Sequence, residues 1–66
     1  MKKISRIAEF RKSRGLTQER LAEMAGLHRV LIARYEAGIT KPSVDSLVKI
    51  AGALHVTVDD LIEKAG

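Results

Sequence analysis

Residues 17–36 read TQERLAEMAGLHRVLIARYE. The spacing of the apolar residues predicts one helix from about Gln18 to Ala25 and a second from about His28 to Ala37. Thr17 is a favourable N-cap for the first helix, because its hydroxyl can accept a hydrogen bond from an otherwise unpaired backbone amide. Gly26 interrupts the pattern only eight residues after the first helix begins, so the sequence predicts two short helices joined by a tight turn.

Three more helices are predicted around this pair. The first extends from about Lys3 to Arg14 and carries apolar residues at helical spacing, namely Ile4, Ile7, Ala8 and Phe10. The fourth follows the N-cap Ser43, and its inward stripe consists of Leu47, Ile50, Ala51 and Leu54. A capping box of Thr57 and Asp60 starts the last helix, which we expect to point Leu61 and Ile62 inward. No segment reads as a strand, so the sequence predicts an all-α, compact five-helix fold.

The composition narrows the class of protein. A chain of 66 residues forms a single domain, residues 1–66, with a thin core. It has no cysteine, which excludes disulfides and thiolate metal sites. Its apolar runs are far shorter than the roughly 20 residues of a membrane helix, and no apolar signal core follows the N-terminal lysines. We therefore expect a cytoplasmic protein with no membrane partner.

The charge is unevenly distributed along the chain. The net charge is +4, with twelve basic and eight acidic residues. Residues 1–42 hold ten of the basic and four of the acidic residues, whereas residues 43–66 hold two and four, so the first part is strongly positive. A basic region on a small domain is typical of a polyanion-binding protein, although many solvated surfaces are also basic. Charge alone therefore favours nucleic acid only weakly.

The helix pair around Gly26 is the helix-turn-helix arrangement, in which the first helix holds the second so that one face enters the major groove of DNA. Residues at fixed spacing extend this pattern over nearly the whole chain: Gly15–Glu19, Leu21-Ala22, Gly26, Ile32, Arg34–Glu36, Gly38, Lys41–Ser43, Leu47, Ile50-Ala51, Ala53-Leu54 and Val56. This set resembles the Cro and phage-repressor type of helix-turn-helix family. The resemblance implies a lambda-repressor-like domain from a bacterium or phage that binds a palindromic operator as a homodimer.

The resemblance also implies roles for individual residues. It places Gln18 against a DNA phosphate, which suits the positive end of a helix dipole; the alternative is an exposed surface glutamine. Base contacts fall to the residues His28, Arg29, Val30 and Arg34. Arginine forks onto O6 and N7 of guanine, whereas the alternative for both arginines is phosphate contact or solvation. Further phosphate contacts are predicted for Thr17, Thr40, Lys41 and Ser43.

Several residues depart from the family pattern. His28 stands where Ser or Thr usually caps the second helix of the pair, so that helix starts with a weaker cap. Val30 and Leu31 are apolar where polar residues are common, and we expect both to point outward. They contact thymine methyl groups in one interpretation and are tolerated surface hydrophobes in the other. Ala37 and Ile39 stand where the family often has polar or basic phosphate ligands. This reduces the contribution to phosphate contact that is predicted for the loop after the third helix.

Other residues have structural interpretations. The resemblance pairs Arg11 of the first helix with Glu36 of the third as a structural ion pair, and two solvated charges are the alternative. Ile32 is expected to face the core, as is Tyr35 with its hydroxyl at the surface. His55 is expected in the turn after the fourth helix. Two histidines without a cysteine give no metal-ligand spacing and no nucleophile–base pair, so we predict no metal, no cofactor and no catalysis.

The sequence is compatible with three functions. The leading hypothesis is a sequence-specific DNA-binding transcription regulator, a repressor acting as a homodimer, with no small-molecule ligand evident. Its dimer interface is predicted at exposed apolar residues near Val56, Val58 and Leu61. The alternative is a protein-interaction module on the same fold, antitoxin-like or a scaffold, with little affinity for DNA. An enzyme is the third hypothesis, and a salt titration of binding separates the first two.

Overall fold

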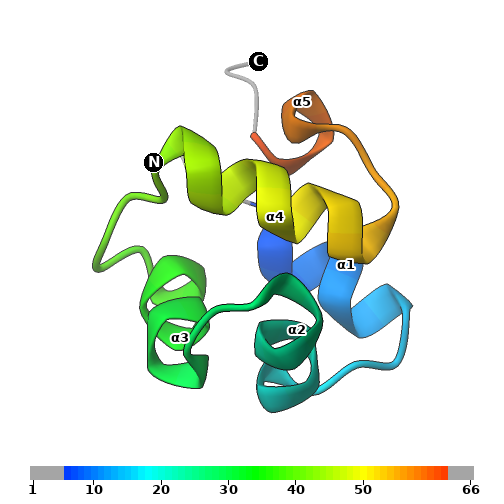
Figure 1. Ribbon diagram of the computed structural model, residues 1–66, viewed down its shortest axis with the longest axis horizontal. Coiled ribbons are helices and arrows are strands. Elements are labelled where there is room, and N and C mark those ends of the chain that lie inside the picture. The colour runs from blue at the N-terminus through cyan, green and yellow to red at the C-terminus, as the bar shows by residue number, and fades with distance from the viewer. Residues whose placement is uncertain (1–5, 63–66) are drawn as a thin grey trace.

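The computed structural model describes residues 6–62, and within this range all of the regular structure is α-helical (Figure 1). Its helices are α1 (Ile7–Ser13), α2 (Gln18–Ala25), α3 (Arg29–Ala37), α4 (Val44–Leu54) and α5 (Val58–Leu61). The predicted all-α fold with these helices in this order is therefore confirmed. The predicted start of the first helix at Lys3, and Ile4 with it, lies outside the described residues.

The hydroxyl residues expected to begin helices do so. The Oγ1 atom of Thr17 and the Oγ atom of Ser43 each accept a hydrogen bond from the backbone amide three residues later, at 3.0 and 3.1 Å. Thr57 and Asp60 form a complete capping box at α5, because each side chain accepts from the backbone amide of the other residue, at 3.1 and 2.9 Å. The helices α2, α4 and α5 therefore each begin at a side-chain cap.

The ends of α2, α3 and α4 lie in the left-handed region of backbone conformation. Gly26 ends α2 with φ of 70°, and this single residue permits the sharp turn into α3. His55 ends α4 with φ of 60°, a conformation that a side chain makes unfavourable. The prediction that His55 lies in the turn after the fourth helix is confirmed, and the turn carries backbone strain that glycine would not.

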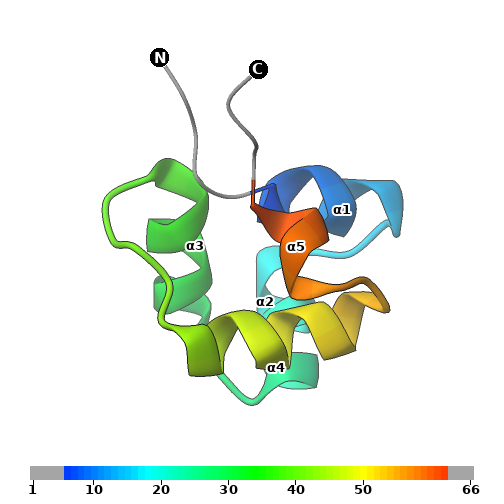
Figure 2. The same ribbon diagram turned by 90° about the horizontal axis from the view of Figure 1, so that it is seen from above.

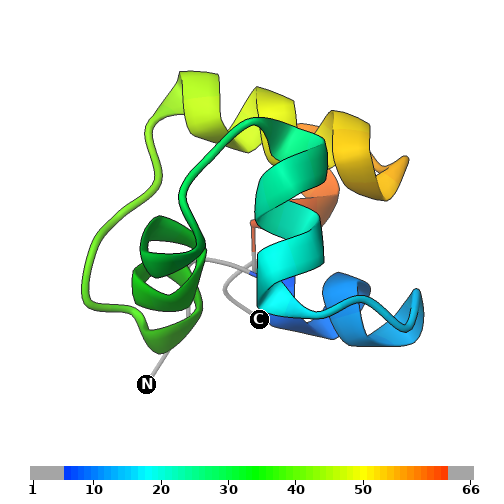
Figure 3. The same cartoon turned by 60° about the horizontal axis from the view of Figure 1, so that its bottom comes forward.

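The longest helix organises the others. In Figure 1, α4 crosses the molecule with α2 and α3 on one side and α5 on the other. Seen from above, α3 occupies one edge, α1 and α5 lie toward the opposite edge, and α4 spans the distance between them (Figure 2). α2 packs against both α3 and α4. Figure 3 shows α2 and α3 next to each other at a steep angle, so α3 is an outlying helix supported from one side.

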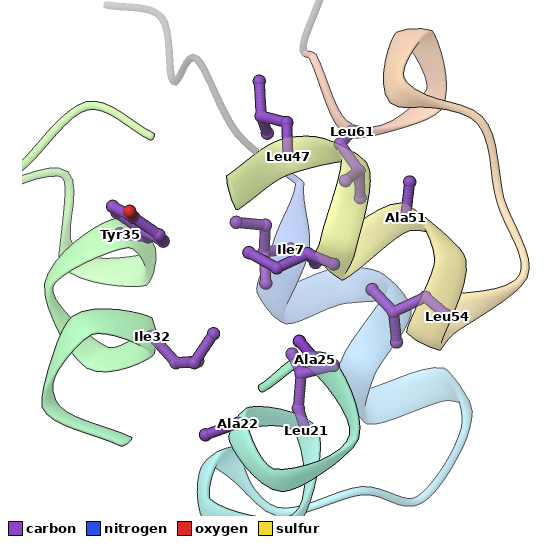
Figure 4. Packing of buried hydrophobic residues seen from close by; sticks show 11 residues of the cluster. Ile7, Leu21, Ala22, Ala25, Ile32, Tyr35, Leu47, Ala51, Leu54 and Leu61 are labelled. Atoms are coloured by element: carbon purple, nitrogen blue, oxygen red, sulfur yellow. The ribbon is translucent and has the colours of Figure 1, made fainter. Parts of the chain in front are cut away.

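The core lies where all five helices meet (Figure 4). Each helix contributes at least one of the fully buried side chains, which are Ile7, Leu21, Ile32, Ile50, Leu54 and Leu61. The predicted inward stripe of α4 is buried, and the prediction that Ile32 faces the core is confirmed. In Figure 4, Ile32 and Tyr35 point from α3 toward the rest of the cluster.

The structure corrects two predicted side-chain directions. Ile62 is 39% exposed instead of inward, because α5 ends at Leu61 and the backbone of Ile62 is extended, with φ of −98° and ψ of 121°. The hydroxyl of Tyr35 is not at the surface, because it donates a buried hydrogen bond of 2.9 Å to the Oγ atom of Ser46 on α4. The hydroxyl of Ser46 thus explains how a tyrosine is accommodated so deeply.

Candidate nucleic-acid interface

One face of α3 is fixed to the body of the protein. Ile32 fills the core, Tyr35 is hydrogen-bonded to α4, and Glu36 is bound by α1. Tyr35 and Glu36 come three and four positions after Ile32, so all three residues lie on the same side of the helix. The opposite side of α3 is consequently exposed and held in a defined orientation.

The contact between Arg11 and Glu36 is a nearly buried, two-pronged ion pair. The Nε and Nη2 atoms of Arg11 donate to the two carboxylate oxygens of Glu36 at 2.7 and 3.0 Å, and the Nη1 atom donates to the carbonyl of Leu16 at 2.7 Å. The side chains are only 11% and 8% exposed. Burial acts to raise the pKa of Glu36, but the hydrogen bonds from Arg11 and Gln18, together with the positive charges of Arg11 and Lys12, outweigh it, so this pKa lies below its ordinary value of 4.5. Both partners are therefore charged at neutral pH.

The exposed side of α3 carries an open groove of about 320 Å³. Its lining residues are Gln18, Arg29, Val30, Ala33, Arg34, Ala37 and Ile39. Arg29 and Arg34 thus lie on one groove, and within residues 6–62 neither guanidinium group has a hydrogen bond or an ion pair. Val30, between them in sequence, is 55% exposed. Three of the four residues expected to contact bases are therefore brought together on this surface.

Gln18 joins the exposed groove to the buried ion pair. Its Nε2 atom donates to the Oε1 atom of Glu36 at 2.9 Å, while its side chain also lines the groove. An amide nitrogen carries two hydrogens, so the second remains available to a ligand outside. Gln18 sits at the first position of α2, where the positive end of the helix dipole attracts an anion. This arrangement gives Gln18 a fixed orientation suited to a phosphate oxygen.

The remaining predicted contact residues do not line this groove. His28 is exposed at the start of α3 and makes no capping hydrogen bond, as expected of a weak cap. Thr17 and Ser43 use their hydroxyl oxygens to cap α2 and α4, which leaves their hydroxyl hydrogens to donate. Thr40 lies half-buried in the loop after α3. Lys41 is exposed and lines a second groove, of about 170 Å³, together with Pro42, Leu47 and Ile62.

Sequence reasoning did not assign Ala33, Ala37 and Ile39 to the groove. The signal was present, because positions 30, 33 and 37 lie three and four residues apart and share one helix face. Leu31, by contrast, is half-buried and packs against the core, so the prediction that it points outward with Val30 is wrong. It lies one turn before Tyr35 and shares the inward edge of α3.

Within residues 6–62, no group of three or more His, Asp or Glu side chains is placed to hold a metal ion. No helix in the same range combines the length and the apolar character that crossing a bilayer requires.

The family model described as Helix-turn-helix matches residues 7–61. This chain belongs to that family, of the Cro and phage-repressor type. Among curated proteins it is similar to the cryptic phage CTXphi transcriptional repressor RstR of Vibrio cholerae, with 38% identity over 61 residues. The match covers 92% of this chain and 54% of the repressor, so the chain spans about half the length of that relative.

Solved structures of the helix-turn-helix family have the same fold. The restriction-modification controller protein C.AhdI from Aeromonas hydrophila matches with a TM-score of 0.81 and 34% identity, covering 83% of each chain. The P22 c2 repressor, solved in complex with a synthetic operator, matches with a TM-score of 0.77 and 31% identity, covering 82% of each chain. The predicted lambda-repressor-like architecture is confirmed by these likenesses.

The predicted dimer interface of this helix-turn-helix protein is not an exposed apolar surface. Leu61 is fully buried, and Val56 and Val58 are partly buried against the core. Their apolar character serves the packing of the short helix α5 and of the turn before it. Among the large hydrophobic residues of α4 and the segment after α5, the exposed ones are instead Val44, Val48 and Ile62.

Proposed function

We propose that this helix-turn-helix chain is a sequence-specific transcription regulator that binds double-stranded DNA through the major groove and acts as a repressor in the cytoplasm. The observation that carries the proposal is the position of Arg29 and Arg34 on one open groove of an otherwise anchored helix. An exposed helix face with two guanidinium groups that have no partner among residues 6–62 suits a major groove about 12 Å wide. The similarity to proteins named as repressors supports the same function.

The roles of the residues follow from their positions. Arg29 and Arg34 each suit the O6 and N7 acceptors of a guanine, and Val30 between them suits an apolar base edge. Gln18 places an N–H toward a phosphate from the start of α2, beside the capping hydroxyl of Thr17. His28 is exposed at the N-cap of α3, after the turn at Gly26, and is proposed to add a contact with the DNA there. Thr40, Lys41 and Ser43 are proposed to contact the sugar–phosphate backbone.

We also propose that the chain, as one domain, binds a palindromic operator as a homodimer. α3 has nine residues and is about 14 Å long, so one copy covers only a few base pairs. Two copies read half-sites about 34–36 Å apart, which is one turn of DNA. Val44, Val48 and Ile62 form the candidate contact face, and Asp45 and Lys49 beside Val48 give it both charges that a self-complementary surface can use.

The test is selection of bound duplexes from a random pool, followed by sequencing. The expected result is a palindrome with guanine at fixed offsets in each half-site. Arg34→Ala should weaken binding by about 1–3 kcal/mol and relax the preference at one position. Arg20→Ala is the matched control, because Arg20 is exposed on α2, pairs with Glu23 and does not line the groove; this variant should keep the same preference. Unchanged affinity and preference in Arg34→Ala would overturn the base-reading role.

One observation favours a second candidate function, a protein-interaction module. Most of the groove lining is apolar, and an apolar groove on an exposed helix suits a hydrophobic segment of another protein. A salt titration distinguishes the two functions. Binding to DNA should weaken with a log–log slope near −0.9 per phosphate contacted, whereas apolar protein association should change little with salt.

A further inference from the structure

The basic side chains of the protein divide into those that are paired within the fold and those that are not. Within residues 6–62, five lysine and arginine side chains have a polar partner, namely Arg6, Arg11, Arg14, Arg20 and Lys49. In the same range four have none, namely Lys12, Arg29, Arg34 and Lys41. Three of these four already have a proposed contact with DNA. Lys12 is the one that has neither a partner among the described residues nor a proposed role.

Lys12 lies in the segment that joins the end of α1 to the start of α2. Arg11, the residue before it, donates to Glu36 at 2.7 Å, and Gln18 at the start of α2 donates to the same carboxylate at 2.9 Å. The carbonyl of Lys12 accepts a hydrogen bond of 2.9 Å from the backbone amide of Gly15, which closes the turn after α1. Lys12 is therefore carried on backbone that is fixed on both sides of it.

The charge of Lys12 belongs to the surface around Gln18. Lys12 is exposed, whereas Arg11 beside it is nearly buried. The positive charge of Lys12 is one of the causes that lower the pKa of Glu36, the carboxylate that Gln18 contacts. An exposed charge acts only over a short range in salt solution, so this effect indicates that Lys12 is close to the Gln18–Glu36 hydrogen bond.

The chemistry of this residue suits the DNA backbone. An ammonium group is a compact charge with three donors and no acceptor, which matches a phosphate oxygen. Since α3 is the helix that enters the major groove in the proposed complex, a cation on α1 meets the backbone instead of the base edges. Successive phosphates of one strand are about 3.4 Å apart along the helix axis, so two neighbouring residues of the protein can each bind one.

We propose that Lys12 binds the phosphate next to the one contacted by Gln18, so that α1 contributes directly to DNA affinity. This contact supplies charge that the loop after α3 lacks, because Ala37 and Ile39 are apolar there. It extends the protein–DNA interface beyond the helix pair to a third helix.

This inference rests on the proposed DNA-binding function, and its test uses the duplex obtained by selection. Dissociation constants are measured by fluorescence anisotropy over a series of salt concentrations. In Lys12→Gln the log–log slope should fall by about 0.9 for each copy of the chain bound. At about 0.1 M salt this variant should bind about eightfold more weakly per copy, and the difference should vanish toward about 1 M. Its sequence preference should not change, because phosphate contacts carry no sequence information.

Two further variants separate a direct contact from a change in net charge. Lys12→Arg keeps the charge and should restore both the slope and the affinity. Arg6→Gln is the matched control, because Arg6 is a partly exposed cation at the opposite end of α1 and pairs with Glu9. It removes the same charge from the protein and should leave the slope unchanged. Circular dichroism checks that each variant remains helical.

Uncharged methylphosphonate groups, placed one at a time in the duplex, locate the phosphate. At the position bound by Lys12, this replacement should weaken binding of the original protein but have almost no further effect on Lys12→Gln. Gln18→Ala should show the same loss of coupling at the adjacent position of the strand.

The outcomes distinguish the inference from the function beneath it. Lys12 is a solvated surface residue, and the inference is overturned, if Lys12→Gln keeps the original slope or if no methylphosphonate position couples to it. A changed sequence preference in Lys12→Gln overturns the backbone role as well. In each of these cases sequence-specific binding by the original protein still stands, whereas failure to select any duplex rejects the proposed function itself.

Discussion

Replacing Glu36 by alanine tests how α3 is held, because it leaves the charge of Arg11 almost without a partner. The Arg11 side chain is 11% exposed, and within residues 6–62 only the Leu16 carbonyl would remain as its hydrogen-bond acceptor. Removing one member of a buried ion pair typically costs about 3–5 kcal/mol, because the stranded charge stays desolvated. A domain of this size has a total stability of the same order, so the loss should be large.

Urea denaturation followed by circular dichroism measures this effect. With a slope near 1 kcal/mol per molar urea, as expected for a small domain, Glu36→Ala should lower the midpoint by about 3–5 M. Glu23→Ala is the matched control, because Glu23 on α2 also pairs with an arginine but both side chains are exposed. Its loss should be below about 1 kcal/mol.

The reasoning remains open to refutation even if Glu36→Ala does not fold. The double variant Arg11→Met, Glu36→Leu removes both charges together and should be close to the original stability, or above it. The buried-charge argument is refuted if Glu36→Ala loses no more stability than Glu23→Ala. It is equally refuted if the double variant is as unstable as Glu36→Ala alone.

Three further predictions concern pH and single contacts. The pKa of Glu36 is lowered on folding, so the contribution of this carboxylate to stability is complete above pH 4.5 and should be lost as the pH falls through the lower folded-state pKa. Urea midpoints measured from about pH 7 to about pH 3 should show this loss of stability. The variant Glu36→Gln should show a smaller loss over the same pH range. Tyr35→Phe should cost about 1–3 kcal/mol in the same assay by leaving the buried Ser46 hydroxyl without its donor, whereas the pair of changes Tyr35→Phe and Ser46→Ala should cost less. His55→Gly should raise the thermal midpoint, with a gain of about 0.5–1 kcal/mol, because the residue has a positive φ of 60°; a lower midpoint would contradict the strain argument.

The features that sequence predicted well depend on local chemistry. Thr17, Ser43 and the capping box at Thr57 start helices through hydrogen bonds that span three residues, and apolar spacing alone places Ile32 in the core. Such signals are contained within one or two turns of helix, so no knowledge of the rest of the fold is needed. The helix order followed from them directly.

The features that sequence did not predict depend on contacts between distant elements. The hydroxyl of Tyr35 is buried because Ser46 lies opposite it on α4, and no local pattern reveals that pairing. Ile62 turns outward because α5 ends one residue before it. Ile39 and Val30 line the same groove because of the direction that the chain takes after α3. The apolar spacing within a helix does not determine that direction.

The residues that anchor α3 to the body of the protein are different from those on its exposed side. Ile32, Tyr35 and Glu36 bear on stability, while the guanidinium groups of Arg29 and Arg34 have no hydrogen bond or ion pair within residues 6–62. Surface substitutions away from such anchoring contacts usually change stability by less than about 0.5 kcal/mol. New target preferences can therefore evolve, or be engineered, by exchanging the outward residues of α3 without any compensating change elsewhere in the chain.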